Sequence, residues 1–328
     1  MMMVKDSYIG LSLFWNQNIL KINSQSIGTD RHDEWLAYYE QFPYFSSDGV
    51  RDACHPRLRE HEGPAEKAIV LVHGLTDSPY FMTAIADFFF EVLGYNVYLP
   101  LLQSHGLKDP KGMEDVKLDA WKKNVDFAID TAAAKSAQVS IGGLSTGGTL
   151  SFYTAATNEK VDGSLYLFSA ALSLAGFFGG LKEFVLRLPA INILLDSDKP
   201  LIGDNPYRYA RMDLDGAKEL AWLIKETDDL IRDLKKQGPF AKPVFAAHSE
   251  CDTIACIKGI EDLQAVSDPE RFTFFRIPKT IGVSHACVVL KEPVYALDAA
   301  EGDAPLEPAN PQFPNMMAAL KAMGESTR

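Results

Sequence analysis

Short apolar runs alternate along most of the chain with stretches whose apolar residues recur every three or four positions. The runs are bounded by turn residues, which is typical of strands covered on both faces. Six runs predict strands, at 67–72, 96–100, 138–142, 161–168, 243–248 and 272–277. The stretches between them predict helices, at 79–93, 118–134, 149–156 and 255–266. Strands that alternate with helices indicate an α/β protein with a mostly parallel central sheet flanked by helices.

This alternation stops at 173–240, which contains no strand pattern. Its first part is apolar on several sides, and 216–236 has the pattern of an amphipathic helix. We expect 173–240 to be a helical insertion that caps a core made of 1–172 and 241–328. A plain extra helical layer is the alternative.

The two ends of the chain are less regular than its middle. Residues 1–50 are rich in aromatic side chains and show no clear period. We expect them to form an irregular extension on the outside of the domain or near the site entrance. An edge strand is expected at 53–59, and the proline-rich tail ends in a predicted helix at 315–323.

Composition is that of a soluble globular protein. The chain has 328 residues, of which 47% are hydrophobic and 23% charged, and it is long enough to bury a core without cross-links. The net charge of −12 argues against a nucleic-acid partner or an anionic membrane surface. The apolar patch at residues 8–15 is too short to span a bilayer and has no cleavage pattern after it. We expect a cytoplasmic monomer or homodimer, with weak lipid contact left open at this patch.

The cysteines suggest no metal site. Cys54, Cys251, Cys256 and Cys287 form no C-x-x-C pair and no zinc spacing with a histidine. They are interpreted as small thiols that are buried or half-exposed. A bridge between Cys251 and Cys287 is left open.

The main chemical motif is Gly143-Leu144-Ser145-Thr146-Gly147, which fits G-x-S-x-G. It lies between a predicted strand and a predicted helix, which is the setting of a nucleophile elbow. Glycines, which lack a Cβ, let strand and helix close around a serine on a sharp, strained turn. Ser145 is therefore the predicted nucleophile, and a glycine-rich connection without chemistry is the alternative.

A serine hydroxyl needs a general base to act as a nucleophile at neutral pH. On a sheet with this kind of elbow, the acid and then the base follow the serine along the chain. Only His248 and His285 follow Ser145. His248 ends a predicted central strand, whereas His285 lies in a loop after the last strand, from which an imidazole can reach across the sheet. His285 is the predicted base.

The carboxylate that orients the base is expected after a strand and before His285. Asp252 follows the strand that ends at His248 and precedes a predicted helix, so it is the first choice and could also cap that helix. Glu250 is a weaker choice. Three aspartates of the insertion qualify only if the acid follows the preceding strand: Asp196, Asp198 and Asp204.

Two backbone N–H groups are expected to stabilise the oxyanion that forms in acyl transfer. One belongs to Thr146, at the start of the helix after the nucleophile. The other is assigned to Leu75, in the loop that follows the strand at 67–72. His73, in the same loop, is interpreted as a structural histidine.

Several of these segments resemble the motifs of one enzyme family. Residues 70–79 are similar to the His-Gly-Phe-Thr-Gly-Ser-Pro stretch of carboxylesterase and monoacylglycerol-lipase-like α/β-hydrolases. Further segments match in chain order: the Pro…Gly-His-Gly segment at 99–106, the Gly-Leu-Ser-Met-Gly-Gly elbow at 143–148, the acid segment at 248–252 and the base segment at 284–285. The similarity covers about 65–290, with Ser104 in place of a family glycine.

The resemblance implies the α/β-hydrolase fold and a serine hydrolase that cleaves carboxylic esters through an acyl-enzyme, with no metal or organic cofactor. The Phe- and Leu-rich insertion would supply an apolar pocket for short- to medium-chain esters or monoglycerides. Its expected acyl contacts are Phe177, Phe178 and Leu181. A peptidase or amidase with the same triad is the nearest alternative, and a non-catalytic ligand-binding scaffold is a more distant one.

Overall fold

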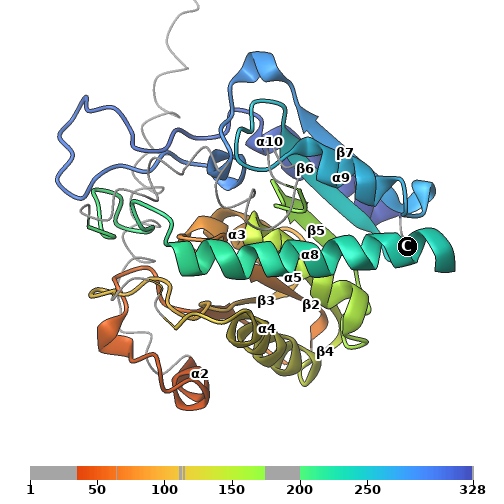
Figure 1. Ribbon diagram of the computed structural model, residues 1–328, viewed down its shortest axis with the longest axis horizontal. Helices are drawn as coiled ribbons and strands as arrows, with labels where there is room; N and C mark the ends of the chain where they lie inside the picture. Colours follow the sequence, from red (N-terminus) through yellow and green to blue (C-terminus); the bar gives the residue numbers. More distant parts are fainter. Residues whose placement is uncertain (1–34, 64, 111–112, 114, 174–199, 327–328) are drawn as a thin grey trace, which may run out of the picture.

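The computed structural model of the chain describes residues 35–63, 65–110, 113, 115–173 and 200–326. These residues form one seven-stranded sheet in the order β1-β3-β2-β4-β5-β6-β7 (Figure 1). The strands are β1 (Arg57–Arg59), β2 (Ala65–Val72), β3 (Asn96–Leu99), β4 (Ser136–Leu144), β5 (Leu165–Phe168), β6 (Val244–Ser249) and β7 (Phe272–Ile277). Every neighbouring pair is parallel except β1 with β3 at the edge. The predicted mostly parallel sheet is confirmed.

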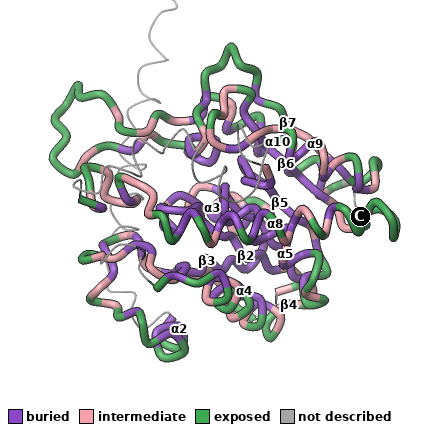
Figure 2. Tube along the Cα trace, viewed as in Figure 1, coloured by how far each residue is buried: buried purple, intermediate pink, exposed green. Residues whose placement is uncertain are grey.

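Helices cover both faces of the sheet because its central strands are apolar on both. In β2, Ile69 and Leu71 pack into one hydrophobic cluster, and Val70 and Val72 pack into the other, as the two-residue period of a strand requires. The first face carries α3 (Thr83–Glu91) and α10 (Phe313–Ser326), and the second carries α4 (Leu118–Ala133), α5 (Thr146–Thr157) and α9 (Ile257–Gln264). Figure 2 shows buried residues along the sheet and its flanking helices, with exposed residues concentrated in the outer loops.

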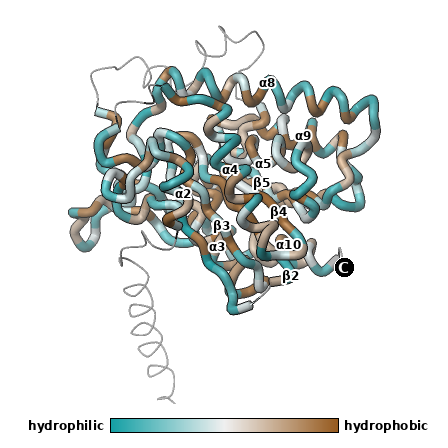
Figure 3. Tube along the Cα trace, turned by 90° about the horizontal axis from the view of Figure 1, so that it is seen from below, coloured by the Kyte–Doolittle hydropathy of each residue, from teal (hydrophilic) through white to brown (hydrophobic). Residues whose placement is uncertain are grey.

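The helix α8 (Leu214–Gln237) forms a further layer outside α5. Its buried side, which includes Leu220, Leu223 and Ile231, joins the hydrophobic cluster of α4 and α5. Figure 1 shows α8 crossing in front of α5, and Figure 3 shows hydrophobic and hydrophilic positions alternating along it. The predicted amphipathic helix at 216–236 is confirmed.

The boundaries of most other elements lie within a few residues of their predicted positions. The helix predicted at 79–93 begins as a 3₁₀ turn, Pro79–Met82, before α3. The edge strand β1 has three residues instead of the whole of 53–59. α9 begins at Ile257, two residues later than expected.

The N-terminal extension differs from its prediction where the structure describes it. Residues 36–41 form the helix α2 (Leu36–Gln41) instead of an irregular segment, so that expectation was wrong. Trp35, Tyr38 and Phe42 are buried and pack their rings against Phe127 of α4. The aromatic residues therefore form a buried cluster between α2 and α4, which stabilises the helix although its short sequence carries no clear period.

Several predictions fall outside the described residues. Residues 174–199 are among them, and with them the expected acyl contacts, Phe177, Phe178 and Leu181. The division into a core and a cap at 173–240 therefore stays a prediction. The apolar patch at 8–15 also lies outside them. Within the described part of the chain, no helix combines the length and the apolar character needed to cross a bilayer.

Candidate active site

Ser145 lies on the sharp turn between β4 and α5. Its backbone has φ 54° and ψ −119°, which non-glycine residues rarely adopt and which costs free energy to hold. Hydrogen bonds support the turn: Ser145 N–H donates to Phe168 O at 3.0 Å, and Ala171 N–H donates to Ser145 O at 3.1 Å. The hydroxyl is thereby fixed at the carboxyl end of β4, and the residue is 8% exposed.

Two glycines of the motif are required by the close approach of backbone segments. A Cβ on Gly147 would lie 2.1 Å from Val72 O and 2.4 Å from His73 O. A Cβ on Gly143 would lie 2.4 Å from the carbonyl carbon of Gly147. Because these distances are shorter than any normal carbon contact, β2, β4 and the start of α5 can meet here only with glycine at both positions.

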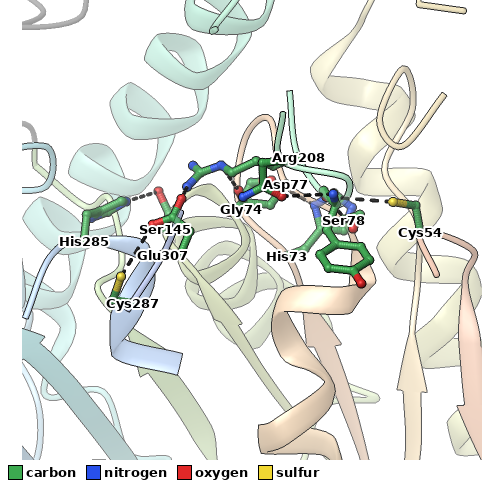
Figure 4. Close-up of polar contacts among 12 residues, drawn as sticks. Cys54, His73, Gly74, Asp77, Ser78, Ser145, Arg208, His285, Cys287 and Glu307 are labelled. Carbon is green, nitrogen blue, oxygen red and sulfur yellow. Dashed lines mark hydrogen bonds and ion pairs between the residues drawn. The ribbon is translucent and has the colours of Figure 1, made fainter. Parts of the chain in front are cut away.

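His285 faces Ser145 from the loop after β7 (Figure 4). Its Nε2 lies 2.8 Å from Ser145 Oγ, and its Nδ1 lies 2.6 Å from Asp252 Oδ2. An ionised carboxylate can only accept, so Nδ1 carries the proton and Nε2 accepts from the serine hydroxyl. Ser249 ties the loop to β6, because its Oγ donates to Val283 O at 2.6 Å.

The two carboxylate oxygens of Asp252 have different partners. Oδ2 accepts from His285, whereas Oδ1 accepts from the N–H groups of Ile254 and Ala255, each at 2.9 Å. Burial by itself raises the pKa of Asp252, but the hydrogen bond from His285 and the neighbouring histidine charges outweigh it and hold that pKa below its ordinary value. The carboxylate therefore stays ionised at neutral pH. It closes a turn before α9 instead of capping it, since the capping position of α9 is Cys256.

Sequence reasoning considers His248 only as a possible base, but the structure places it against Asp252. Its Nε2 lies 3.5 Å from Asp252 Oδ2 and 3.2 Å from Ala255 O. The side chain is fully buried, and burial lowers the pKa of His248. The imidazole thus packs against the carboxylate and bonds to the turn that carries it. The position of His248 at the end of β6, directly before the acid turn, is the sequence signal for this contact.

The other acid candidates have different surroundings. The carboxylate of Glu250 accepts from the N–H of Lys279 at 3.1 Å, which ties the acid turn to the base loop. Asp204 is exposed, and Asp196 and Asp198 lie outside the described residues. In the part of the chain that the structure describes, the carboxylate bound to His285 is that of Asp252.

The peptide between Gly74 and Leu75 is held in one orientation. Gly74 O accepts from His73 Nδ1 at 2.9 Å and from Asp77 N–H at 3.2 Å. The C=O and N–H of a trans peptide point in opposite directions, so the N–H of Leu75 points away from these two donors. His73 Nε2 accepts from Leu102 N–H at 3.1 Å, and the prediction of a structural histidine is confirmed.

Both predicted oxyanion donors lie beside the nucleophile. Thr146 is the first residue of α5, where the N–H groups have no partner within the helix and the helix dipole favours negative charge. The loop of Leu75 abuts the serine, since a Cβ on Gly74 would lie 3.2 Å from Ser145 Cβ. The role of the two N–H groups stays a prediction.

An ion cluster adjoins this loop, and sequence reasoning missed it. Arg208 Nε lies 3.1 Å from Asp77 Oδ1, and Arg208 Nη1 lies 2.7 Å from Glu307 Oε1 (Figure 4). Asp77 is 2% exposed. Burial raises the pKa of Asp77, and the charge of Arg208 offsets this effect only in part. The three residues come from distant parts of the chain, so their spacing in the sequence gives no signal.

The cysteines form no bridge at the site. Cys54, Cys251, Cys256 and Cys287 are free thiols. Cys251 Sγ donates to Lys279 O at 3.1 Å, and Cys287 Sγ accepts from Ser284 Oγ at 3.0 Å. The bridge left open between Cys251 and Cys287 is therefore not formed. Among the residues described, no group of three or more His, Cys, Asp or Glu side chains is arranged to hold a metal ion.

These groups form one continuous hydrogen-bonded series at the carboxyl end of the sheet. The hydroxyl of Ser145 is joined through the imidazole of His285 to the carboxylate of Asp252. Such a series can take the hydroxyl proton as the oxygen attacks an electrophilic carbon. The backbone donors beside it can receive the negative charge that the attack creates.

Known proteins resemble the chain in part of its sequence and in its fold. No protein-family model matches the chain. A thermostable monoacylglycerol lipase from Bacillus sp. strain H-257 is 30% identical over 145 residues, which is 43% of this chain and 53% of that lipase. The similarity thus spans about half the length of this relative.

Solved structures resemble the chain over more of its length. A structure reported for the metagenome-derived lipolytic enzymes LipS and LipT covers 84% of this chain and 99% of its own, with a TM-score of 0.61 and 16% identity. The monoacylglycerol lipase of Paleococcus ferrophilus covers 82% and 99%, with a TM-score of 0.53 and 17% identity. A soluble variant of monoglyceride lipase from Saccharomyces cerevisiae covers 84% and 96%, with a TM-score of 0.52 and 14% identity. The chain has the α/β-hydrolase fold and resembles the lipases and esterases built on it.

Proposed function

We propose that this chain is a serine hydrolase that cleaves carboxylic esters through a covalent acyl-enzyme. The observation that carries the proposal is the series Ser145–His285–Asp252, with 2.8 Å from Oγ to Nε2 and 2.6 Å from Nδ1 to Oδ2. A base within such a distance can take a proton from the nucleophile. The similarity to a monoacylglycerol lipase supports an ester as the substrate.

In the first half of the reaction, Ser145 Oγ attacks the ester carbonyl carbon while Nε2 of His285 takes the hydroxyl proton. The N–H groups of Leu75 and Thr146 stabilise the resulting oxyanion. The intermediate collapses, and the alcohol leaves with the proton from His285. Asp252 keeps the imidazole in the required tautomer and stabilises the imidazolium.

Water completes the cycle in the second half. His285 takes a proton from a water molecule, whose oxygen attacks the acyl carbon bound to Ser145. A second tetrahedral intermediate forms at the same oxyanion site. Its collapse returns the proton from His285 to Ser145 Oγ and releases the carboxylic acid. No step of this cycle calls for a metal ion or an organic cofactor.

We expect the substrates to be short- to medium-chain acyl esters or monoglycerides. The relative's description as a monoacylglycerol lipase supports this class, and so does the Phe- and Leu-rich sequence of the insertion. Removing an acyl chain from water contributes about 0.8 kcal/mol for each CH₂. Specificity should therefore rise with chain length until the acyl pocket is filled, with Phe177, Phe178 and Leu181 as its expected contacts.

Active-site labelling tests the mechanism. A fluorophosphonate probe should label the wild-type chain and should fail to label Ser145→Ala. Ser151→Ala is the matched control, because Ser151 is a buried serine on α5, six positions after Ser145, whose Oγ donates to Gly147 O. Equal labelling of the wild type and Ser145→Ala would refute the assignment of the nucleophile.

A substrate series tests the reaction class. p-Nitrophenyl esters of increasing acyl length should be hydrolysed, and the values of kcat/KM should pass through a maximum. Amino-acid arylamides should be cleaved far more slowly. Absence of ester hydrolysis at every chain length would contradict the proposed function, and faster cleavage of arylamides would indicate an amidase or peptidase.

A further inference from the structure

Arg208 is the centre of the ion cluster beside the loop of Leu75. Its guanidinium contacts Asp77 at 3.1 Å and Glu307 at 2.7 Å, and its central carbon lies 5.3 Å from the centre of the Phe81 ring. Figure 4 shows Arg208 between the Asp77 loop and Glu307. Two carboxylates and a ring together hold a planar cation in one orientation.

Arg208 belongs to 200–213, a segment of the predicted insertion, and this segment is hydrogen-bonded to the same loop. Tyr209 N–H donates to Thr76 O at 2.8 Å. Ser78 Oγ donates to Tyr207 O at 2.7 Å. The loop and the segment 200–213 therefore form one hydrogen-bonded unit, which contains both Arg208 and Asp77.

The position of Asp77 explains why a cation is needed. A Cβ on Gly74 would lie 2.5 Å from Asp77 Oδ2 and 3.2 Å from Ser145 Cβ, so the carboxylate and the nucleophile flank the same glycine. An unpaired carboxylate in this place would repel the negative charge that develops on the substrate oxygen, with little solvent to screen it. Pairing with Arg208 offsets that repulsion.

Asp77 also acts through its backbone. Its N–H donates to Gly74 O at 3.2 Å, and this bond helps to fix the peptide whose N–H belongs to Leu75. Because Arg208 holds the Asp77 side chain, it also restrains the backbone segment that makes this bond. The ion pair with Arg208 therefore affects the charge beside the oxyanion and the direction of one of its donors.

We propose that Arg208 is a positioning residue for the oxyanion hole, which it serves by holding and neutralising Asp77. The inference rests on the proposed function, because it assigns a part in the same acyl-transfer site. It makes 200–213, a segment of the predicted insertion, a component of the active site. Arg208 acts through Asp77 and does not itself bind the reacting ester group.

A double-mutant cycle tests the inference. Arg208→Met removes the charge, and kcat for a p-nitrophenyl ester should fall about 10- to 100-fold while KM changes by less than about threefold. Adding Asp77→Asn removes the carboxylate that has lost its partner, so the double variant should regain about tenfold of this loss. Glu307→Gln in the same Arg208→Met background is the matched control, because it removes the other orphaned carboxylate and should restore little.

A tetrahedral inhibitor gives a second readout. A trifluoromethyl ketone forms an oxyanion adduct with a serine, so its inhibition constant should rise by the factor by which kcat falls. A merely structural loss would change KM, the thermal midpoint and kcat together, and Asp77→Asn would not reverse it. That outcome would overturn the inference, and so would equal recovery with Glu307→Gln.

A second substitution at Arg208 and a labelling experiment complete the test. If Arg208→Met does not fold, the cycle is run with Arg208→Lys, whose point charge cannot bridge both carboxylates, and the same order of rescue is expected.

Fluorophosphonate labelling separates this inference from the proposed function. If the wild type is labelled and hydrolyses esters while Asp77→Asn gives no rescue, the assignment of Arg208 alone fails. If the wild type is neither labelled nor active, the proposed function fails, and this inference fails with it.

Discussion

Asp252 and His285 are joined by a hydrogen bond of 2.6 Å although they lie 33 positions apart in the sequence. They meet because β6 and β7 are parallel neighbours, so the loops after both strands emerge at the same edge of the sheet. Two further contacts join these loops, from Ser249 Oγ to Val283 O and from Lys279 N–H to Glu250. The geometry of the pair is thus fixed by the sheet and by contacts outside the pair.

This relationship predicts a large effect of Asp252→Asn on the rate. An amide in place of the carboxylate can donate to the ring and favour the wrong tautomer of His285, so kcat should fall by about 10³- to 10⁴-fold with little change in KM. Steady-state kinetics on one ester substrate measures both constants. Glu250→Gln is the control on the same turn, and its loss should stay below about tenfold because its partner is a backbone N–H. A comparable loss in both variants would contradict the assignment of the acid.

The sequence predicts most of the sheet and the residues that meet at its edge. Strands such as β2 and β6 can be predicted because most of their residues are buried on both faces of the sheet and form a nearly continuous apolar run. Ser145 can be predicted as the nucleophile because the strained turn requires glycines at fixed positions. Asp252 and His285 follow from chain order once the parallel sheet is assigned.

Other parts of the site depend on contacts between distant polar residues, which leave no periodic trace. The pairing of Arg208 with Asp77 and Glu307 joins residues of the loop after β2, the predicted insertion and the C-terminal region. The sequence around each of these residues is equally compatible with a side chain exposed to solvent. The short helix α2 was missed for a related reason. Its aromatic residues are buried against α4, and their spacing in the sequence does not show the period of a helix.

The elbow glycines predict a strong destabilisation by Gly147→Ala. The added methyl group would lie 2.1 Å from Val72 O and 2.4 Å from His73 O, which are backbone atoms of β2 and its loop. Backbone cannot move aside cheaply, so the free energy of unfolding should fall by about 3 kcal/mol or more. Urea denaturation measures this free energy.

Gly324→Ala is the control for this prediction, because a Cβ at Gly324 in α10 would meet nothing within 4 Å. This change should add up to about 1 kcal/mol to the free energy of unfolding. Similar values for the two variants would show that the elbow is not tightly packed.

The position of α8 predicts unequal effects of the same substitution on its two sides. Leu223 on the inner side of α8 is completely buried, whereas Leu214 on the same helix is 47% exposed. Leu223→Ala should lower the free energy of unfolding by about 2–5 kcal/mol, and Leu214→Ala by less than about 1 kcal/mol. Urea denaturation of both variants provides the comparison. Equal small losses would mean that α8 does not pack on α5 as a layer of the core.

The ionised state of Asp252 predicts a loss of stability in acid. Burial alone raises the pKa of Asp252, but the hydrogen bond from His285 outweighs it, so the pKa in the folded chain lies below the value of about 3.9 in the unfolded chain. A depressed carboxyl pKa contributes stability that is present above the unfolded value and is lost as the pH falls through the folded value. The difference in free energy of unfolding between the wild type and Asp252→Asn should therefore be constant above about pH 5 and shrink below about pH 4. Urea denaturation between about pH 3 and 6 measures this difference. A difference that stays constant over the whole range, or grows toward acid, would show that the carboxylate is not stabilised in its ionised form.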